Sequence, residues 1–359
     1  MSLRGARGLV LISKNPPCEV LASMVADATA MGGDRIGDER DFYTRVTCKE
    51  FKGEYGQRLS SRRRGHKFEA NLYQNDAALL RNAVAPIYDL DPVAMVVRNF
   101  ENEGISSVVR RARTKRVLED LADGKPVPDL LIQPALLLRI GGAQGGSIFI
   151  KPDFLVLDPK VRFYVPGEIK SFIVRDGVGD PGDLDRTRRQ AGVEIIALRD
   201  EATLVGLSDR VLDRAVFVFA TPYGLTPHEP YEEQLRAEVQ EIKRAIRVLR
   251  DAQAKLKRLR EPIDAPLEML LDELGIHYQE GCLGNCILAG PCKERYTGKA
   301  RLLGDAATDL LGADADLSRI YELLDGAPPR TAREAAIAEI LIRAEEDLGF
   351  RAPVARRVA

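Results

Sequence analysis

The chain has 359 residues, of which 45% are hydrophobic and 30% are charged, so it should bury an ordinary core as one large domain or two smaller ones. Its formal net charge of −1 argues neither for nor against a nucleic-acid partner. The apolar run 8–13 is too short for a secretory leader or a membrane span, so we expect a cytoplasmic protein with no membrane partner. Three of the five cysteines lie between positions 282 and 292, which favours a metal site in a reducing compartment over a disulfide framework.

The first third of the chain is predicted to form one short strand followed by helices. The strand is expected at residues 8–13, and two prolines then precede a helix over about residues 18–30. Apolar side chains recur at helical spacing between residues 72 and 121, broken by prolines, which predicts several helices. Residues 125–134 are punctuated by prolines and are expected to cross to the next region.

The middle of the chain is predicted to form a β meander. Strands are expected at residues 136–140, 147–157 and 161–173, with a glycine turn at 141–146 and a second turn at 158–160. The glycine pairs lie between strands, and no Gly-Lys-Ser/Thr follows them at the required spacing. The pattern therefore excludes a P-loop nucleotide site.

The remaining elements are predicted to be mainly helical. We expect a helix at 186–198, a buried strand at 215–220 and one long helix at 230–260 with basic residues on its outer faces. After the cysteines the composition becomes acidic and rich in alanine. Thr331 and Glu334 have the capping-box spacing that opens a last helix.

Asp153 and Glu168 are candidate ligands for a hard divalent cation such as Mg²⁺ or Mn²⁺. Glu168 and Lys170 are two apart on a predicted strand, so they point to the same face. Counting back through the turn places Asp153 opposite about Val165 or Pro166, and we expect the Pro-Gly pair there to disrupt the ladder so that the carboxylates converge. An ion between them would polarise a phosphodiester and lower the pKa of a bound water, which Lys170 would position. The same residue types at alternate strand positions also occur on ordinary solvated faces.

Two more side chains and three basic runs complete the candidate site. His66 can bind a metal as neutral imidazole or contact a phosphate, and Gln190 can orient a water or the substrate. A single basic run is usually a solvated face, but three in one chain favour a phosphate-facing channel. The runs are Arg62, Arg63, Arg64 with Lys67, then residues 110–116, and residues 243–260.

Three cysteines are spaced so that their thiolates can occupy three corners of a tetrahedral site: Cys282, Cys286 and Cys292. Such a site requires a fourth ligand. Cys48 and Cys18 are the candidates for an iron-sulfur cluster, whereas His277 would complete a Cys₃His zinc site. A free cysteine is otherwise commonly a small buried hydrophobe.

These motifs carry a resemblance to a known family. Gly65-His66, Asp153, Glu168-Ile169-Lys170 and Gln190 resemble, in order and type, the RecB-like branch of the PD-(D/E)XK nuclease superfamily. With one cysteine before the histidine motif and three near the carboxyl end, the chain looks similar to the CRISPR-associated iron-sulfur exonucleases of that branch and to related bacterial recombination nucleases. The resemblance covers about residues 41–296. The family's glutamine motif usually continues to a tyrosine, whereas Ala-Gly-Val-Glu follows here.

The resemblance implies an α/β fold with a restriction-endonuclease-like mixed sheet flanked by helices. It implies an N-terminal extension at residues 1–40 and a nuclease domain at 41–300 that contains a helical insertion at about 72–134. Residues 301–359 would form an acidic helical C-terminal region.

The resemblance also implies the chemistry: a phosphodiesterase that acts as an exonuclease on single strands or DNA ends. In it, His66, Asp153 and Glu168 would bind Mg²⁺ or Mn²⁺, with Lys170 and Gln190 catalytic. A structural 4Fe-4S cluster would be held by Cys48, Cys282, Cys286 and Cys292, the remote Cys48 occupying the position expected in the family. The implied setting is CRISPR adaptation, phage defence or DNA repair, with DNA and CRISPR integration or other defence proteins as partners. A non-catalytic nucleic-acid-binding module and a restriction-like endonuclease with a Cys₃His zinc site remain the alternatives.

Overall fold

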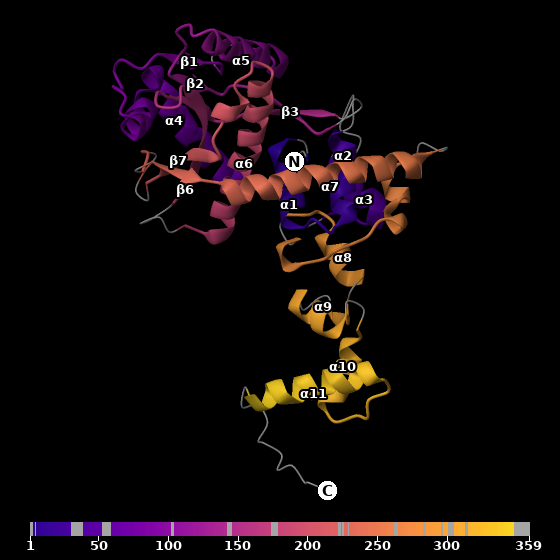
Figure 1. The fold of residues 1–359 in the computed structure, drawn as a ribbon. Helices are drawn as coiled ribbons and strands as arrows, with labels where there is room; N and C mark the ends of the chain where they lie inside the picture. The colour runs from indigo at the N-terminus through magenta and orange to yellow at the C-terminus, as the bar shows by residue number, and fades with distance from the viewer. Residues whose placement is uncertain are drawn as a thin grey trace. The chain divides into compact units, whose positions relative to one another are not determined.

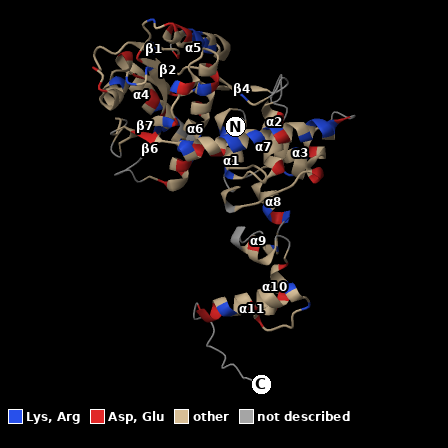
Figure 2. Ribbon diagram, viewed as in Figure 1, with Lys and Arg blue, Asp and Glu red and all other residues tan. Residues whose placement is uncertain are grey.

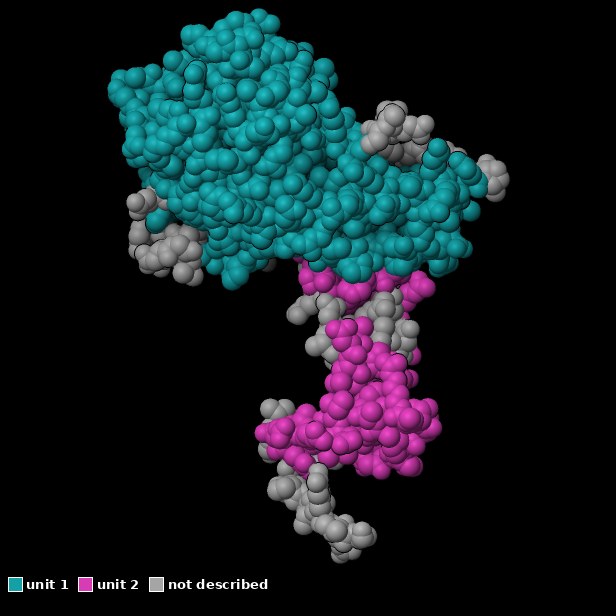
Figure 3. Space-filling model, viewed as in Figure 1, with its two compact units in different colours: residues 1–46, 56–275 teal, residues 47–55, 276–359 magenta. Residues whose placement is uncertain are grey.

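The structure is a computed structural model that describes residues 3–347 apart from residues 4, 30–38, 52–58, 102–103, 142–145, 174–178, 222–223, 225, 229, 262–264, 283–284, 296, 301–304 and 313–314. The chain forms two compact units, coloured separately in Figure 3. The first comprises residues 1–46 and 56–275, and the second comprises residues 47–55 and 276–359. The predicted glycine turn lies largely outside the described residues.

The first unit is built on a mixed six-stranded sheet with the order β1-β2-β5-β6-β7-β8. Strands β1 and β2 pair in parallel, as do β6 and β7, and the other neighbours are antiparallel. A separate two-stranded sheet contains β3 and β4. The strands are β1 (Val97–Asn99), β2 (Leu130–Ile132), β3 (Leu136–Arg139), β4 (Ser147–Ile150), β5 (Phe154–Asp158), β6 (Phe163–Ile173), β7 (Arg214–Ala220) and β8 (Tyr231–Gln234).

Helices surround this sheet, which confirms the predicted α/β class with a mixed sheet flanked by helices (Figure 1). The helices of the first unit are α1 (Ala6–Lys14), α2 (Glu19–Thr29), α3 (Glu39–Thr47), α4 (Leu59–Val84), α5 (Ser107–Ala122), α6 (Pro181–Thr203) and α7 (Arg236–Arg260). Short 3-10 turns lie at Ala85–Tyr88, Ser208–Arg210, Leu267–Met269, Leu271–Glu273 and Glu280–Cys282. No helix in the described part of the chain has the length and apolar composition needed to cross a membrane.

Helix α4 packs on one face of the sheet and α6 lies toward the other. A buried core joins α4 to alternate strand residues, among them Phe68, Leu72, Phe154 and Ile169. Because side chains alternate along a strand, Glu168 and Lys170 point away from the face that carries Ile169. Glu168 accepts a hydrogen bond from Gln190 of α6, so the predicted polar pair faces this helix.

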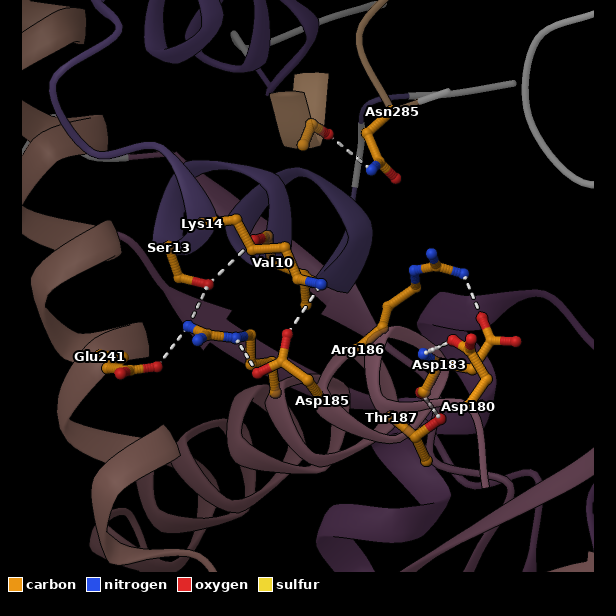
Figure 4. Close-up of polar contacts among 12 residues, drawn as sticks. Val10, Ser13, Lys14, Asp180, Asp183, Asp185, Arg186, Thr187, Glu241 and Asn285 are labelled. Atoms are coloured by element: carbon orange, nitrogen blue, oxygen red, sulfur yellow. Dashed lines mark hydrogen bonds and ion pairs between the residues drawn. The ribbon is translucent and has the colours of Figure 1, made fainter. Parts of the chain in front are cut away.

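A polar contact fixes α6 against its neighbours. Arg189 donates to Asp185 on the same helix at 2.8 Å and to Ser13 of α1 at 3.2 Å. The same guanidinium pairs with Glu241 of α7 (Figure 4). Arg189 directly precedes Gln190, so its contacts fix the rotation of α6 about its own axis next to the candidate site.

Two predicted elements, which overlap helices α1 and α7, are wrong. Residues 8–13 lie in helix α1 and do not form a strand, because Leu9 to Ile12 are buried all round and a short apolar run satisfies either structure. The predicted helix at 230–260 begins only at Arg236. Before it, strand β8 pairs with β7, and Tyr231 packs against the rings of Phe217 and Phe219.

The segment around Asp153 also differs from the prediction. The single strand expected at 147–157 is two strands in different sheets, because Pro152 lacks a backbone donor and interrupts the ladder. The region at 72–134, predicted to be helical, contributes β1 and β2 to the main sheet. Its remaining helices, α4 and α5, agree with the apolar spacing.

The pairing of β5 with β6 corrects the predicted register. Phe154 pairs with Gly167 and Val156 with Val165, so Asp153, which precedes Phe154, lies level with Glu168 and not with Val165 or Pro166. The Pro-Gly pair does not disrupt this ladder, and the irregularity lies instead between β6 and β7. Gly167 is required because the ring of Phe154 occupies the space that a Cβ would fill.

The second unit contains four helices: α8 (Ala289–Arg295), α9 (Asp305–Leu311), α10 (Leu317–Leu324) and α11 (Ala332–Asp347). The Thr331 half of the predicted capping box is confirmed at the start of α11, whereas Glu334 bonds the residue before Thr331. Thr331 Oγ1 accepts from the backbone N–H of Glu334 at 3.1 Å, and Glu334 Oε2 accepts from the N–H of Arg330 at 2.6 Å. Arg319 of α10 pairs with the same carboxylate at 2.8 Å, which ties the two helices together.

Candidate active site

Asp153, Glu168 and Lys170 come together where β5 and β6 meet. Asp153 directly precedes β5, and its Oδ2 accepts a hydrogen bond from the N–H of Ile169 at 2.7 Å. Glu168 is fully buried, and Lys170 pairs with its Oε2. The three side chains predicted to carry the chemistry are therefore in one place.

Gln190 and Glu194 add a second layer from α6. Gln190 Nε2 donates to Glu168 Oε1 at 2.6 Å, which fixes that carboxylate. Glu194 lies one turn further along the same face and is only 1% exposed. Its Oε2 has no hydrogen-bond partner within the described part of the chain. Glu194 was not among the predicted site residues, although an acidic residue inside the largely apolar run 191–198 was a usable signal in the sequence.

Electrostatics at this site are dominated by excess carboxylate. Burial and the negative charge of Glu168 raise the pKa of Asp153 to about 8. Burial, together with the charge and hydrogen bond of Glu168, raises the pKa of Glu194 well above its ordinary value. Burial alone would lower the pKa of Lys170, but the charges of Glu168 and Asp153 outweigh it and hold that pKa above its usual range. Lys170 is therefore charged, with three carboxyl groups around it.

This donor set fits a hard divalent cation, because carboxylate oxygens are the ligands that Mg²⁺ and Mn²⁺ prefer and a buried excess of negative charge favours a cation. The ligands are engaged by other partners instead: Lys170 and Gln190 contact the two oxygens of Glu168. Among the residues that the structure describes, no group of three His, Cys, Asp or Glu side chains is arranged to hold a metal ion. Binding would therefore require Lys170 to release Glu168 Oε2.

Helix α4, which packs on the opposite face of the sheet from α6, contributes polar side chains near the site. His66, Glu69 and Tyr73 recur at three- and four-residue spacing and share one face of the helix. The hydroxyl of Tyr73 donates to the carbonyl oxygen of Asp153 at 3.3 Å. Burial raises the pKa of Glu69, and the nearby charge of Lys170 partly offsets this effect. The exposed imidazole of His66 lies on this face but is not assembled with the carboxylates into a ligand set.

The cysteines predicted to hold a cluster all lie in the second unit, in spite of their separation in the sequence: Cys48, Cys282, Cys286 and Cys292. Cys48 is exposed and the other three are half-buried. Cys18 belongs to the first unit, is buried, and accepts the N–H of Leu21 at 3.5 Å in the first turn of α2. In the described residues, neither these thiols nor His277 form a metal-binding group.

The predicted basic runs have different environments. Arg63 and Lys67 are exposed and Arg64 is partly buried near the start of α4, while the side chain of Arg62 lies outside the described part. Figure 2 shows lysines and arginines along α5 and α7. Two members of the α5 run have structural partners, since Arg111 pairs with Glu201 and Arg110 donates to the carbonyl of Gln133.

Comparison with known proteins adds little. No family model and no curated protein matches the chain. A solved structure named "Crystal structure of SSO0001" shares 16% sequence identity and covers 55% of this chain and 85% of that chain, with a TM-score of 0.22. A likeness at that TM-score carries no argument, so the function must be argued from the residues of the site.

Proposed function

We propose that the chain is a metal-dependent DNA nuclease whose hydrolytic centre is formed by Asp153, Glu168 and Lys170. The observation that carries the proposal is the excess of acids at this site, where the buried carboxyl groups of Glu168 and Glu194 and the partly buried carboxyl group of Asp153 all act on one ammonium group, that of Lys170. A buried excess of carboxylate is unfavourable without a cation or a shared proton. A divalent ion would relieve it and would supply the chemistry of phosphodiester hydrolysis.

In this proposal Asp153 and Glu168 hold Mg²⁺ or Mn²⁺, with His66 as a further ligand from α4. When bound, such an ion polarises a phosphodiester and lowers the pKa of a water nucleophile. The N–H of Ile169 keeps the Asp153 carboxylate oriented, and the amide of Gln190 does the same for Glu168. Lys170 remains charged and would stabilise the negative charge that develops on the phosphate oxygens.

DNA is the proposed substrate because exposed basic side chains adjoin the site. Arg63 and Lys67 flank His66 on α4 and are exposed. Further exposed arginines, Arg113 and Arg116, lie on α5. Phosphate contacts of this kind give affinity that falls with salt, and they do not select a base sequence. Single strands and DNA ends are the proposed forms, as the family resemblance implies.

The decisive test of the nuclease proposal compares wild type with Glu168→Gln on single-stranded, blunt duplex and circular DNA, each with Mg²⁺ or Mn²⁺. Wild type should degrade at least one linear form, and Glu168→Gln should lose on the order of a thousandfold in rate while still binding DNA. Wild type that binds DNA but degrades none of these forms would replace the nuclease with a nucleic-acid-binding module.

We also propose a structural 4Fe-4S cluster on Cys48, Cys282, Cys286 and Cys292. Support comes from the membership of all four cysteines in one compact unit, to which the short segment 47–55 contributes Cys48. Cys18 is a poor ligand by comparison, because it is buried at the start of α2 in the other unit. A cluster would cross-link segments distant in the sequence and so stabilise the second unit.

Metal analysis of anaerobically purified protein tests the cluster. Wild type and Cys18→Ser should be brown and contain iron in excess of zinc, whereas Cys48→Ser should lose most of the iron. Colourless wild type with one zinc, together with unchanged metal content in Cys48→Ser, would favour a Cys₃His zinc site completed by His277.

A further inference from the structure

A cavity of about 760 Å³ lies beside helix α4, and its described lining residues all belong to the first unit. They include His66, Glu69 and Tyr73 of α4, and also Asn99 of β1 and Glu101 just after it. A volume of this size is typical of sites for small molecules, which range from about 300 to 1,000 Å³.

Two lining residues of the cavity lie near the candidate active site. Tyr73 lines the cavity, and the hydroxyl of this tyrosine donates to the carbonyl oxygen of Asp153. Glu69 also lines the cavity, and the charges of Lys170 and Glu168 act on its carboxylate. A molecule in the cavity would therefore lie close to the backbone of Asp153, although the side chains of Asp153 and Glu168 are not among the described lining residues.

The charges that line the cavity argue against a phosphate. The described lining residues include the carboxylates of Glu69, Asp76 and Glu101, of which Asp76 pairs with Arg81 at 3.6 Å. Among these described residues, His66 is the only basic side chain that lines the cavity. A phosphate monoester carries up to two negative charges at neutral pH and would be repelled here, so the cavity suits an uncharged ligand.

The other lining groups match a nucleoside. Amides of Gln74, Asn75 and Asn99 offer hydrogen-bond donors and acceptors of the kind that recognise the edges of bases. The ring of Tyr73 offers a surface on which a base can stack, and Ile132 adds apolar area. These groups surround a volume large enough for one nucleoside.

We propose that this cavity holds the unphosphorylated terminal nucleoside of a DNA strand while the adjoining phosphodiester reaches Asp153 and Glu168. This inference rests on the proposed nuclease function and specifies its substrate: a strand end that carries a hydroxyl and not a phosphate. The cavity would thus select a strand end that carries a hydroxyl, because its carboxylates repel a phosphate at that end.

The backbone of the cavity wall is strained. Helix α4 is interrupted at Gln74, and the next three residues are left-handed, with φ of 51° at Asn75, 55° at Asp76 and 56° at Ala77. This region is unfavourable for non-glycine residues, because the Cβ lies too close to the following carbonyl oxygen. An uninterrupted helix would avoid that cost. All four residues line the cavity, and strain of this kind is concentrated at ligand sites.

The test uses the full chain with Mn²⁺ and one internally labelled single-stranded oligonucleotide that carries a hydroxyl or a phosphate at the 5′ or the 3′ end. A phosphate at the end that enters the cavity should lower kcat/KM by roughly tenfold or more, as expected for one or two uncompensated charges. A phosphate at the other end should have no effect. Glu101→Gln should reduce the discrimination roughly threefold, because one repulsive charge is lost. The matched control, Glu119→Gln on α5, lies outside the cavity and should discriminate like wild type.

A second measurement does not depend on catalysis. Calorimetry of the Lys170→Ala chain without divalent metal should show that deoxyadenosine binds more tightly than deoxyadenosine 5′-monophosphate. Adding Tyr73→Leu, which removes the stacking ring, should lower the affinity for deoxyadenosine. Equal rates on all the oligonucleotides, together with equal binding of the two ligands, would overturn the cavity proposal and leave the nuclease intact. Preference for the nucleoside that Glu101→Gln relaxes, in a protein that degrades no DNA, would support the cavity and overturn the nuclease.

Discussion

Two buried glutamates on α6 illustrate two uses of a carboxylate in this molecule. Glu201 is 2% exposed and receives a bidentate contact from Arg111, with distances of 2.6 and 3.2 Å, together with the N–H of Leu137 at 2.9 Å. Glu194, about two turns earlier on the helix, is just as buried but has an oxygen without a partner among the described residues and contacts another acid, Glu168.

This difference in partners distinguishes a glutamate that stabilises the fold from one that is available for chemistry. A buried carboxylate with its own arginine is satisfied in the folded protein and needs nothing further. Near Glu194, acids outnumber the one cation, Lys170, and the protein does not correct the imbalance itself. Excess buried charge of this kind is typical of sites that bind a cation or share a proton.

Among the variants that leave the proposed metal ligands in place, Lys170→Ala should have the largest effect. If this lysine stabilises charge in the transition state, its loss should lower the rate of DNA degradation on the order of a hundredfold and leave DNA affinity nearly unchanged. Single-turnover kinetics and fluorescence anisotropy would measure the two quantities. A variant that degrades DNA at the wild-type rate would show that Lys170 only neutralises Glu168.

A smaller effect should distinguish the two glutamates directly. Glu194→Gln should lower the affinity for Mn²⁺ about tenfold, as expected for a group next to the metal ligands, and should change the free energy of unfolding by less than about 1 kcal/mol. Glu201→Gln should destabilise the protein by about 3 kcal/mol, because Arg111 loses its partner, without altering Mn²⁺ affinity.

Isothermal titration with Mn²⁺ and chemical denaturation of both variants measure these changes. Similar behaviour of the two variants, whether in metal affinity or in stability, would contradict the distinction between a structural and a chemical carboxylate.

The smallest effect concerns a partly buried, paired acid in the second unit, Glu334. The hydrogen bond from Arg319 lowers the pKa of Glu334 to about 2. A depressed acid pKa stabilises the folded state above the ordinary pKa, near 4.5, and this contribution is lost as the pH falls toward 2. Hydrogen exchange in α10 and α11 should therefore be faster in Glu334→Gln than in wild type at pH 6 and equal in both at pH 2. A difference between the two proteins that persists at pH 2 would assign the effect to lost packing.

Elements with a strong local signal could be predicted from the sequence. The capping box at Thr331, the helix around residues 186–198 and the buried strand at 215–220 each depend on side chains close together in the sequence. The strand predicted at residues 8–13 was wrong because an apolar run of that length fits a buried helix as well as a strand. Strand β8 was not predicted because its pairing depends on contacts with β7 that are not local.

The candidate site was predictable in its residue types and not in its geometry. The alternation of Glu168 and Lys170 and the polar Gln190 on the following helix were visible in the sequence, and the structure brings them together with Asp153. The predicted register of β5 on β6 was wrong because the turn was predicted at residues 158–160, whereas the observed loop spans residues 159–162. The roles of Glu194 and Tyr73 depend on the rotation of two helices, which tertiary packing decides.

The central claim is that the carboxylates of the first unit bind a divalent ion. Mn²⁺ binding to the purified full chain, followed by electron paramagnetic resonance, tests it most directly. Wild type and Glu201→Gln should bind the ion, whereas Asp153→Asn and Glu168→Gln should lose most of the binding and retain wild-type circular dichroism. Wild type that binds no Mn²⁺, or Glu168→Gln that binds it as wild type does, would contradict the account.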